Sequence, residues 1–269
     1  MNEVRYVLMD PSKNITILVK TTIPIEKQNE VAKKLMRLEP SAEQLAFIMS
    51  SNENEISLRM AGGEFCGNAS MSAVSYYAID NKLDSHDTNV VFYGNKNDII
   101  SRVNVNVKKL VDGSYEGTVY MPPAKRIEKV NLSSYSNLPI IVFDGISHII
   151  IDKEIEKNDA EKYIKDWCKE LNLEALGLMF YKKIDDSNYE LKPLVYVRDI
   201  DSLFWENACA SGSFAFGTYV MQKQNKLSQV FIKQAGGDVL KVKKDDDGNL
   251  SLINNIKILS EKTINGDMI

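Results

Sequence analysis

Two of the three cysteines lie in short segments that are rich in glycine, serine and asparagine. Cys66 is followed by residues 67–70 and Cys209 by residues 210–213, each just after a predicted hairpin and just before a predicted helix. Each thiol is therefore expected at a helix N-terminus, where the helix dipole and the unpaired N–H groups favour a thiolate. The same N–H groups can hold a carboxylate. Each segment thus predicts a base beside a carboxylate-binding site.

A pair of such thiols indicates proton transfer on both faces of one carbon atom. One thiolate removes the α-proton of an amino acid, and the opposite thiol delivers a proton to the other face. Donors aimed at the substrate carboxylate stabilise the carbanion in a site from which water is excluded. Cys66 and Cys209 therefore suggest racemisation without pyridoxal phosphate. Two other readings stay open, namely thiols that are merely buried and a disulfide between them.

The remaining cysteine and the histidines favour structural roles. Cys168 lies on an apolar helix stripe with Ile164 and Trp167, which predicts a place in the core. The chain has two histidines, and His148 is expected to pack inside a strand. Because neither CxxC nor HxxxH spacing occurs, we expect no metal site and no dithiol redox centre.

Composition indicates an ordinary globular protein. The chain has 269 residues, of which 44% are hydrophobic and 26% charged, and its net charge is −4. This weak charge gives no reason to expect nucleic acid or an anionic membrane as a partner. No apolar run approaches the roughly 18 residues of a membrane helix, and the first residues do not resemble a signal peptide. We therefore expect a cytoplasmic protein. The paired thiols, and not the composition, indicate a small-molecule amino acid as its partner, and a homodimer is a further expectation.

Strand and helix patterns alternate through the chain and predict an α+β fold. In the first half, short strands precede a helix at Glu26–Leu38, and a hairpin over residues 47–60 leads to the Cys66 segment. The second half repeats this order, with a helix at Asp159–Leu171 and a hairpin around residues 185–188 before the Cys209 segment. We therefore expect a duplicated fold, with residues 1–121 carrying Cys66 and residues 122–269 carrying Cys209. The last strand can return to the first half.

The two cysteine motifs resemble those of the diaminopimelate epimerases. Residues 64–68 resemble the first motif of that family, and residues 209–212 resemble the second. Weaker similarities are spread over nearly the whole chain, at residues 14–17, 43–44, 145–148 and 236–240. The resemblance implies two pseudo-symmetric halves, each a β-barrel-like sheet wrapped around a central helix, with the site in the cleft between them.

Differences from that family reduce the number of possible substrates. The family's arginine beside a glutamate, upstream of the second cysteine, is missing from residues 204–208, and Ile146 replaces the asparagine of the family's Gly-Asn-Pro-His motif. The family's substrate-binding asparagine before the first cysteine has no clear counterpart near Met60. Residues 64–72 and 205–209 are more similar to the cofactor-independent histidine racemases of the same superfamily. This resemblance implies interconversion of L- and D-histidine. The alternatives are epimerisation of diaminopimelate or another diamino acid, and an inactive protein that binds an amino acid.

The resemblance also implies roles for individual residues. Cys66 and Cys209 become the acid/base pair, and no cofactor or metal is expected. Backbone N–H groups after each cysteine would hold the α-carboxylate of the substrate. Glu206 would bind its α-ammonium group, and polar residues of the first half would bind its side chain. The alternative roles are a turn for Asn14, a solvated loop for Glu43 and Gln44, and a helix cap for Glu206. The complete substrate-binding set is Asn14, Glu43, Gln44, Gly67, Asn68, Glu206, Ala210 and Ser211.

Overall fold

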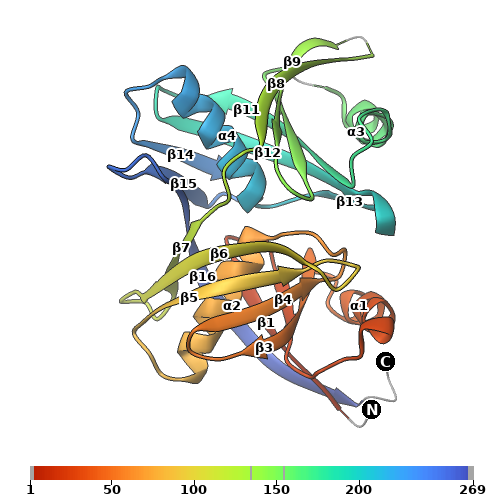
Figure 1. Ribbon diagram of the computed structural model, residues 1–269, viewed down its shortest axis with the longest axis vertical. Helices are drawn as coiled ribbons and strands as arrows, with labels where there is room; N and C mark the ends of the chain where they lie inside the picture. The colour runs from red at the N-terminus through yellow and green to blue at the C-terminus, as the bar shows by residue number, and fades with distance from the viewer. Residues whose placement is uncertain (1–2, 134, 154, 266–269) are drawn as a thin grey trace. The chain divides into compact units, whose positions relative to one another are not determined.

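The computed structural model describes residues 3–133, 135–153 and 155–265. Within these ranges the chain forms sixteen strands, four α-helices and one short 3-10 helix, η1 (Arg198–Ile200), which confirms the α+β class. The chain divides into two compact units (Figure 1). Unit 1 contains the residues up to Tyr120 together with those from Ile253 onward, and unit 2 is Met121–Leu252.

The strands of unit 1 form a closed barrel. They follow one another as β1-β2-β3-β4-β5-β6-β7-β16, and β1 pairs antiparallel with β16 to complete eight strands. The pairs β2–β3 and β4–β5 are parallel, and helices connect the strands of both pairs. The strand bounds are β1 (Glu3–Pro11), β2 (Thr16–Val19), β3 (Gln44–Ser51), β4 (Glu55–Met60), β5 (Ser85–Tyr93), β6 (Ile99–Lys109), β7 (Tyr115–Tyr120) and β16 (Leu250–Asn265).

The two helices of unit 1 differ in what they bury. The first, α1 (Ile25–Leu38), is amphipathic, and its buried stripe of Val31, Ala32 and Leu35 packs toward β3. The second, α2 (Gly67–Asp80), is buried on nearly all sides and contacts β1 to β7. Small side chains permit this proximity, since a Cβ on Gly117 of β7 would lie 3.0 Å from the Met71 Cβ. The predicted helices at Glu26–Leu38 and after Gly67 are both confirmed.

Unit 2 contains an open sheet in the order β8-β9-β10-β11-β12-β14-β15, with β13 paired to β12 and the first residues of β16 next to β15. Helix α3 (Lys157–Glu170) packs against β11 and β12, whereas α4 (Ala210–Lys223) contacts β10, β11, β14 and β15. Cys168 of α3 is fully buried, which confirms its core position. The strand bounds are β8 (Arg126–Leu132), β9 (Tyr135–Val142), β10 (Ser147–Ile151), β11 (Ala175–Lys183), β12 (Asn188–Val197), β13 (Ser202–Trp205), β14 (Gln229–Gln234) and β15 (Val239–Lys244).

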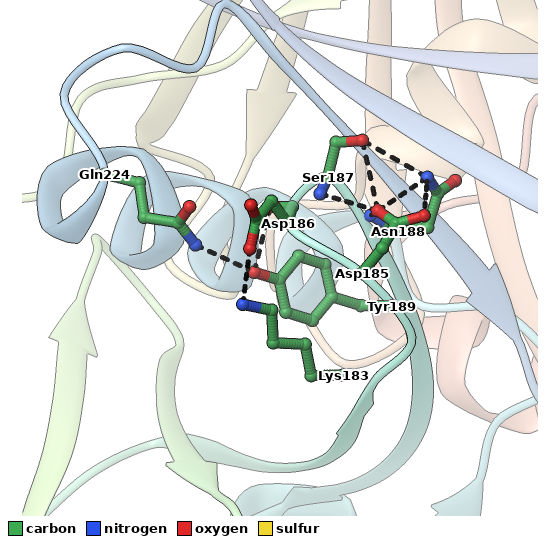
Figure 2. Close-up of polar contacts among 7 residues, drawn as sticks. All are labelled: Lys183, Asp185, Asp186, Ser187, Asn188, Tyr189 and Gln224. Carbon is green, nitrogen blue, oxygen red and sulfur yellow. Dashed lines mark hydrogen bonds and ion pairs between the residues drawn. The ribbon is translucent and has the colours of Figure 1, made fainter.

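The turn between β11 and β12 lies where the sequence predicted it and connects to the C-terminal end of α4 (Figure 2). The Asp185 carboxylate accepts hydrogen bonds from the backbone N–H groups of Ser187 and Asn188, each at 2.8 Å. The side chain of Gln224, which follows the last residue of α4, donates to the Tyr189 hydroxyl at 3.0 Å. This turn therefore supports the end of α4 that is farthest from Cys209.

A substitution at Gly217 can test how closely α4 packs against β15. A Cβ on Gly217 would lie 2.6 Å from the Val242 Cβ, which is shorter than a normal contact. Alanine favours a helix over glycine by about 1 kcal/mol, but the clash forces α4 or β15 to move. We expect Gly217→Ala to lower the free energy of unfolding by about 1–3 kcal/mol, measured by denaturant titration. A variant at least as stable as the parent would contradict this contact.

Candidate active site

Cys66 caps the N-terminus of α2. Its backbone is extended (φ −140°, ψ 113°), and its sulfur accepts a hydrogen bond from the Ala69 N–H at 3.3 Å. The thiol donates to Gln44 Oε1 at 3.0 Å, and the residue is buried. The predicted position of this thiol at a helix N-terminus is therefore confirmed, and Gln44, a predicted site residue, is in direct contact with it.

Buried amide side chains continue from α2 toward Glu43. The Asn68 Nδ2 donates to Asn14 Oδ1 at 2.8 Å, and the Asn14 Nδ2 donates to Glu43 Oε2 at 2.6 Å. Asn14 and Asn68 are fully buried. Asn14 is thus more than a turn residue, and four predicted residues of unit 1, Asn14, Glu43, Gln44 and Asn68, lie together at the Cys66 end of α2.

Sequence reasoning missed two members of this network. The Asn254 Nδ2 donates to Asn68 Oδ1 at 3.2 Å, and the Ser12 hydroxyl donates to Asn254 Oδ1. Asn254 lies on β16, far along the chain from Asn68, and its neighbours on the same buried face are Leu252 and Ile256. A polar residue at a buried position of an alternating strand pattern was the available signal.

The buried Arg59 and the exposed Asn95 hold the loop before Cys66. Arg59 donates to Asn95 Oδ1 at 2.9 Å, and Asn95 donates to the carbonyl oxygen of Gly62 at 3.2 Å. Gly63 has φ +75°, and a Cβ there would lie 2.5 Å from the Asn95 amide oxygen. Burial raises the pKa of Glu64, and the positive charge of Arg59 opposes that rise. The loop therefore depends on a glycine and on a buried arginine.

Cys209 caps α4 in the same manner. Its backbone is extended (φ −117°, ψ 109°), and its sulfur accepts from the Gly212 N–H at 3.4 Å. The Ser211 hydroxyl lies 3.7 Å from that sulfur. The Cys209 N–H donates to Gln234 Oε1 at 3.1 Å, and Gln234 donates to the Ser213 hydroxyl at 2.8 Å. Gln234, which the sequence reasoning also missed, thus fixes the start of α4.

The electrostatic surroundings of Cys209 favour a neutral thiol. Burial raises the pKa of Cys209 well above its ordinary value, and the charge of Glu206 and its hydrogen bond with the thiol raise it further. The Gly212 N–H and the Ser211 hydroxyl act in the opposite direction. The expectation that the helix N-terminus favours a thiolate is therefore outweighed at Cys209, because burial is the larger effect. Glu206 itself is buried beside the thiol.

His148 is a packed strand histidine, as predicted. It is fully buried on β10, with its ring centroid 6.2 Å from that of Phe143. Its partner in β11 is Gly177, where a side chain would collide with the imidazole. Burial lowers the pKa of His148 to about 3, so the ring is neutral at physiological pH.

The described residues contain neither a metal-binding cluster nor a membrane-spanning helix. No cluster of three or more His, Cys, Asp or Glu side chains within residues 3–133, 135–153 and 155–265 has the geometry to hold a metal ion. None of the helices in those ranges is long and apolar enough to span a membrane.

Comparison with known proteins adds an independent observation. The family model described as the histidine racemase CntK N-terminal domain matches residues 3–265. A histidine racemase from Fusobacterium nucleatum is 31% identical over 241 residues, which cover 86% of each chain. A histidine racemase from Staphylococcus aureus is 27% identical over 243 residues, covering 86% of this chain and 85% of the relative.

Solved structures share the fold at low sequence identity. A hydroxyproline epimerase from Agrobacterium vitis matches with a TM-score of 0.68 at 9% identity, over 99% of this chain and 94% of that one. A protein from Pseudomonas aeruginosa described as a predicted epimerase matches with a TM-score of 0.71 at 9% identity, over 97% and 99% of the two chains. Together these similarities identify an isomerase that acts as an amino-acid racemase. The chain belongs to the histidine racemase family described by the CntK N-terminal domain model.

Proposed function

We propose that this racemase interconverts L- and D-histidine without a cofactor, using Cys66 and Cys209 on opposite faces of the α-carbon. The observation that carries the proposal is the same cap at two helices, where each cysteine sulfur accepts the N–H of the third residue after it. Similarity to histidine racemases supports histidine as the substrate. The proposal includes two pseudo-symmetric halves, residues 1–121 and 122–269 with the last strand returned to the first half, each wrapped around its cysteine-bearing helix.

The first turns of the two helices supply donors for the α-carboxylate. The first N–H groups of a helix have no partner within the helix, and the helix dipole makes them attractive to an anion. The N–H groups of Gly67 and Asn68 begin α2, and those of Ala210 and Ser211 begin α4. Such donors bind the carboxylate and stabilise the negative charge that develops on it when the α-proton leaves.

The thiols exchange one proton each with the α-carbon. The base thiolate takes the α-proton and becomes a thiol, while the opposite thiol protonates the other face and becomes a thiolate. The raised pKa of Cys209 suits it to the acid role, and the neighbouring Glu206 is positioned to hold the thiol proton when Cys209 acts as the base. Because a carboxylate accepts several hydrogen bonds, Glu206 can also bind the α-ammonium.

The polar residues beside Cys66 suit an imidazole. Imidazole presents N–H donors, and Glu43 and Gln44 present carboxylate and amide oxygens. Asn14 holds the Glu43 carboxylate at 2.6 Å. We therefore assign Asn14, Glu43 and Gln44 to recognition of the substrate side chain.

The substrate is tested by proton exchange. Reduced protein is incubated in deuterated water with single L-amino acids, including histidine, and with meso-diaminopimelate, without pyridoxal phosphate. We expect loss of the histidine α-proton signal in NMR spectra and formation of D-histidine. Exchange only with diaminopimelate would overturn histidine as the substrate, and absence of exchange with every amino acid would overturn the racemase proposal.

Single cysteine variants test the two-thiol mechanism. Cys66→Ser and Cys209→Ser should each lower the racemisation rate by roughly 10²- to 10⁴-fold, because a hydroxyl is a poor base and acid at neutral pH. Each variant should still exchange the α-proton of one enantiomer, since the remaining thiol works from one face. Cys168→Ser is the matched control and should keep the parent rate. Near-parent racemisation by either active-site variant would rule the mechanism out.

Glu206→Gln tests the electrostatic control of Cys209. The Glu206 carboxylate raises the pKa of this thiol, so its removal should lower that pKa, while the effect of burial remains. Alkylation of Cys209, followed against pH by mass spectrometry, should shift its midpoint to lower pH, and racemisation should slow. A midpoint that stays unchanged or rises would contradict the assigned contact between the carboxylate and the thiol.

A further inference from the structure

We propose that Asn254 is a positioning residue, because its fixed amide sets the direction of a series of hydrogen bonds that ends on the Glu43 carboxylate. The link to catalysis rests on the proposed function, in which Glu43 receives the substrate side chain. The direction of the hydrogen bonds itself can be tested without any substrate. All residues of this hydrogen-bond series belong to unit 1.

Every group in the chain donates toward Glu43. The Ser12 hydroxyl donates to Asn254 Oδ1, and Asn254 Nδ2 donates to Asn68 Oδ1 at 3.2 Å. Asn68 Nδ2 donates to Asn14 Oδ1 at 2.8 Å, and Asn14 Nδ2 donates to Glu43 Oε2 at 2.6 Å. The serine and the three asparagines are all buried, so water does not readily replace these partners.

The orientation of the amides is imposed from both ends. At one end the Glu43 carboxylate only accepts, so the Asn14 amide must present its NH₂ group. At the other end the backbone N–H of Asn255 donates to Asn254 Oδ1 at 2.8 Å, and a backbone N–H cannot accept. The Asn254 NH₂ group must therefore face Asn68. The Glu43 carboxylate and the Asn255 N–H therefore impose the same direction of donation, so each of the three amides has a single orientation.

This arrangement connects β16 to the proposed substrate site. The aligned amide dipoles point their positive ends toward Glu43 and stabilise its negative charge. The hydrogen bond from Asn14 also holds the carboxylate in one position. A substrate side chain that donates an N–H group therefore meets an acceptor whose charge and orientation depend on Asn254, three hydrogen bonds away.

Asn254→Asp should reverse the direction of the hydrogen bonds while keeping the shape of the side chain at position 254. Aspartate cannot donate to the Asn68 oxygen, so Asn68 must turn its NH₂ group toward the new carboxylate, and Asn14 must then present its oxygen to Glu43. Two acceptors would face each other, and we expect the melting temperature to fall by roughly 4–10 °C.

Glu43→Gln, combined with Asn254→Asp, should restore the melting temperature, because an amide at position 43 can donate to the reoriented Asn14 side chain. We expect the double variant to melt at least half-way back toward the parent. Residues 43 and 254 are separated by two amides, and sites without contact normally have additive effects on stability. Strictly additive melting temperatures would overturn the proposal.

Kinetics separate the positioning role from a purely structural one. For Asn254→Asp we expect the KM for histidine to rise roughly tenfold, with a smaller change in kcat. Asn255→Asp places the same change on the exposed neighbouring residue and should alter neither the melting temperature nor KM. A parent that fails to racemise histidine would refute the proposed function, whereas the stability cycle would still decide the direction of the hydrogen bonds.

A second variant covers the case in which Asn254→Asp does not fold. Asn254→Ser shortens the side chain and removes the fixed amide without adding a charge. Because Asn68 Oδ1 then loses the amide donor and Asn68 is oriented from the Glu43 end alone, we expect a higher KM for histidine at similar kcat. An unchanged KM in this folded variant would overturn the positioning role of Asn254.

Discussion

A hydrogen bond from a helix N–H group to a cysteine sulfur determines the geometry on which both candidate catalytic groups depend. The sulfur of Cys66 accepts from Ala69, and that of Cys209 accepts from Gly212. The bond requires extended backbone at the cysteine and a helix that begins at the next residue, and both are observed twice. It leaves the first N–H groups of each helix beside the thiol, which is where a substrate carboxylate is expected.

Burial of these helix ends imposes the next constraint. The strands contact the helices closely, so small residues such as Gly117 and Gly217 stand where larger side chains would collide. A buried end also requires partners for its polar groups, because an unpaired buried amide costs roughly 1–3 kcal/mol. In unit 1 asparagine side chains meet this need, and in unit 2 Gln234 does so for the Cys209 N–H and the Ser213 hydroxyl.

Burial also changes the chemistry of the thiol. At Cys209 the helix N–H lowers the pKa, but burial and Glu206 raise it by more. In the proposed mechanism a thiol that keeps its proton is a suitable acid, and the Glu206 carboxylate would receive that proton when Cys209 acts as the base. The burial that raises the pKa of Cys209 is also the property that the proposed mechanism requires to exclude water from a carbanion.

The sequence by itself determined the features that depend on neighbouring residues. A cysteine cap bonds to a residue three positions later, so the residues around Cys66 and Cys209 were sufficient to predict both helix starts, and alternating patterns predicted the hairpins. Only the tertiary structure revealed Ser12, Asn254 and Gln234, because their partners lie far away in the chain and local patterns carry no information on which buried groups meet. The direction of the Cys209 pKa shift was likewise decided by folding, since burial is the summed effect of many distant residues.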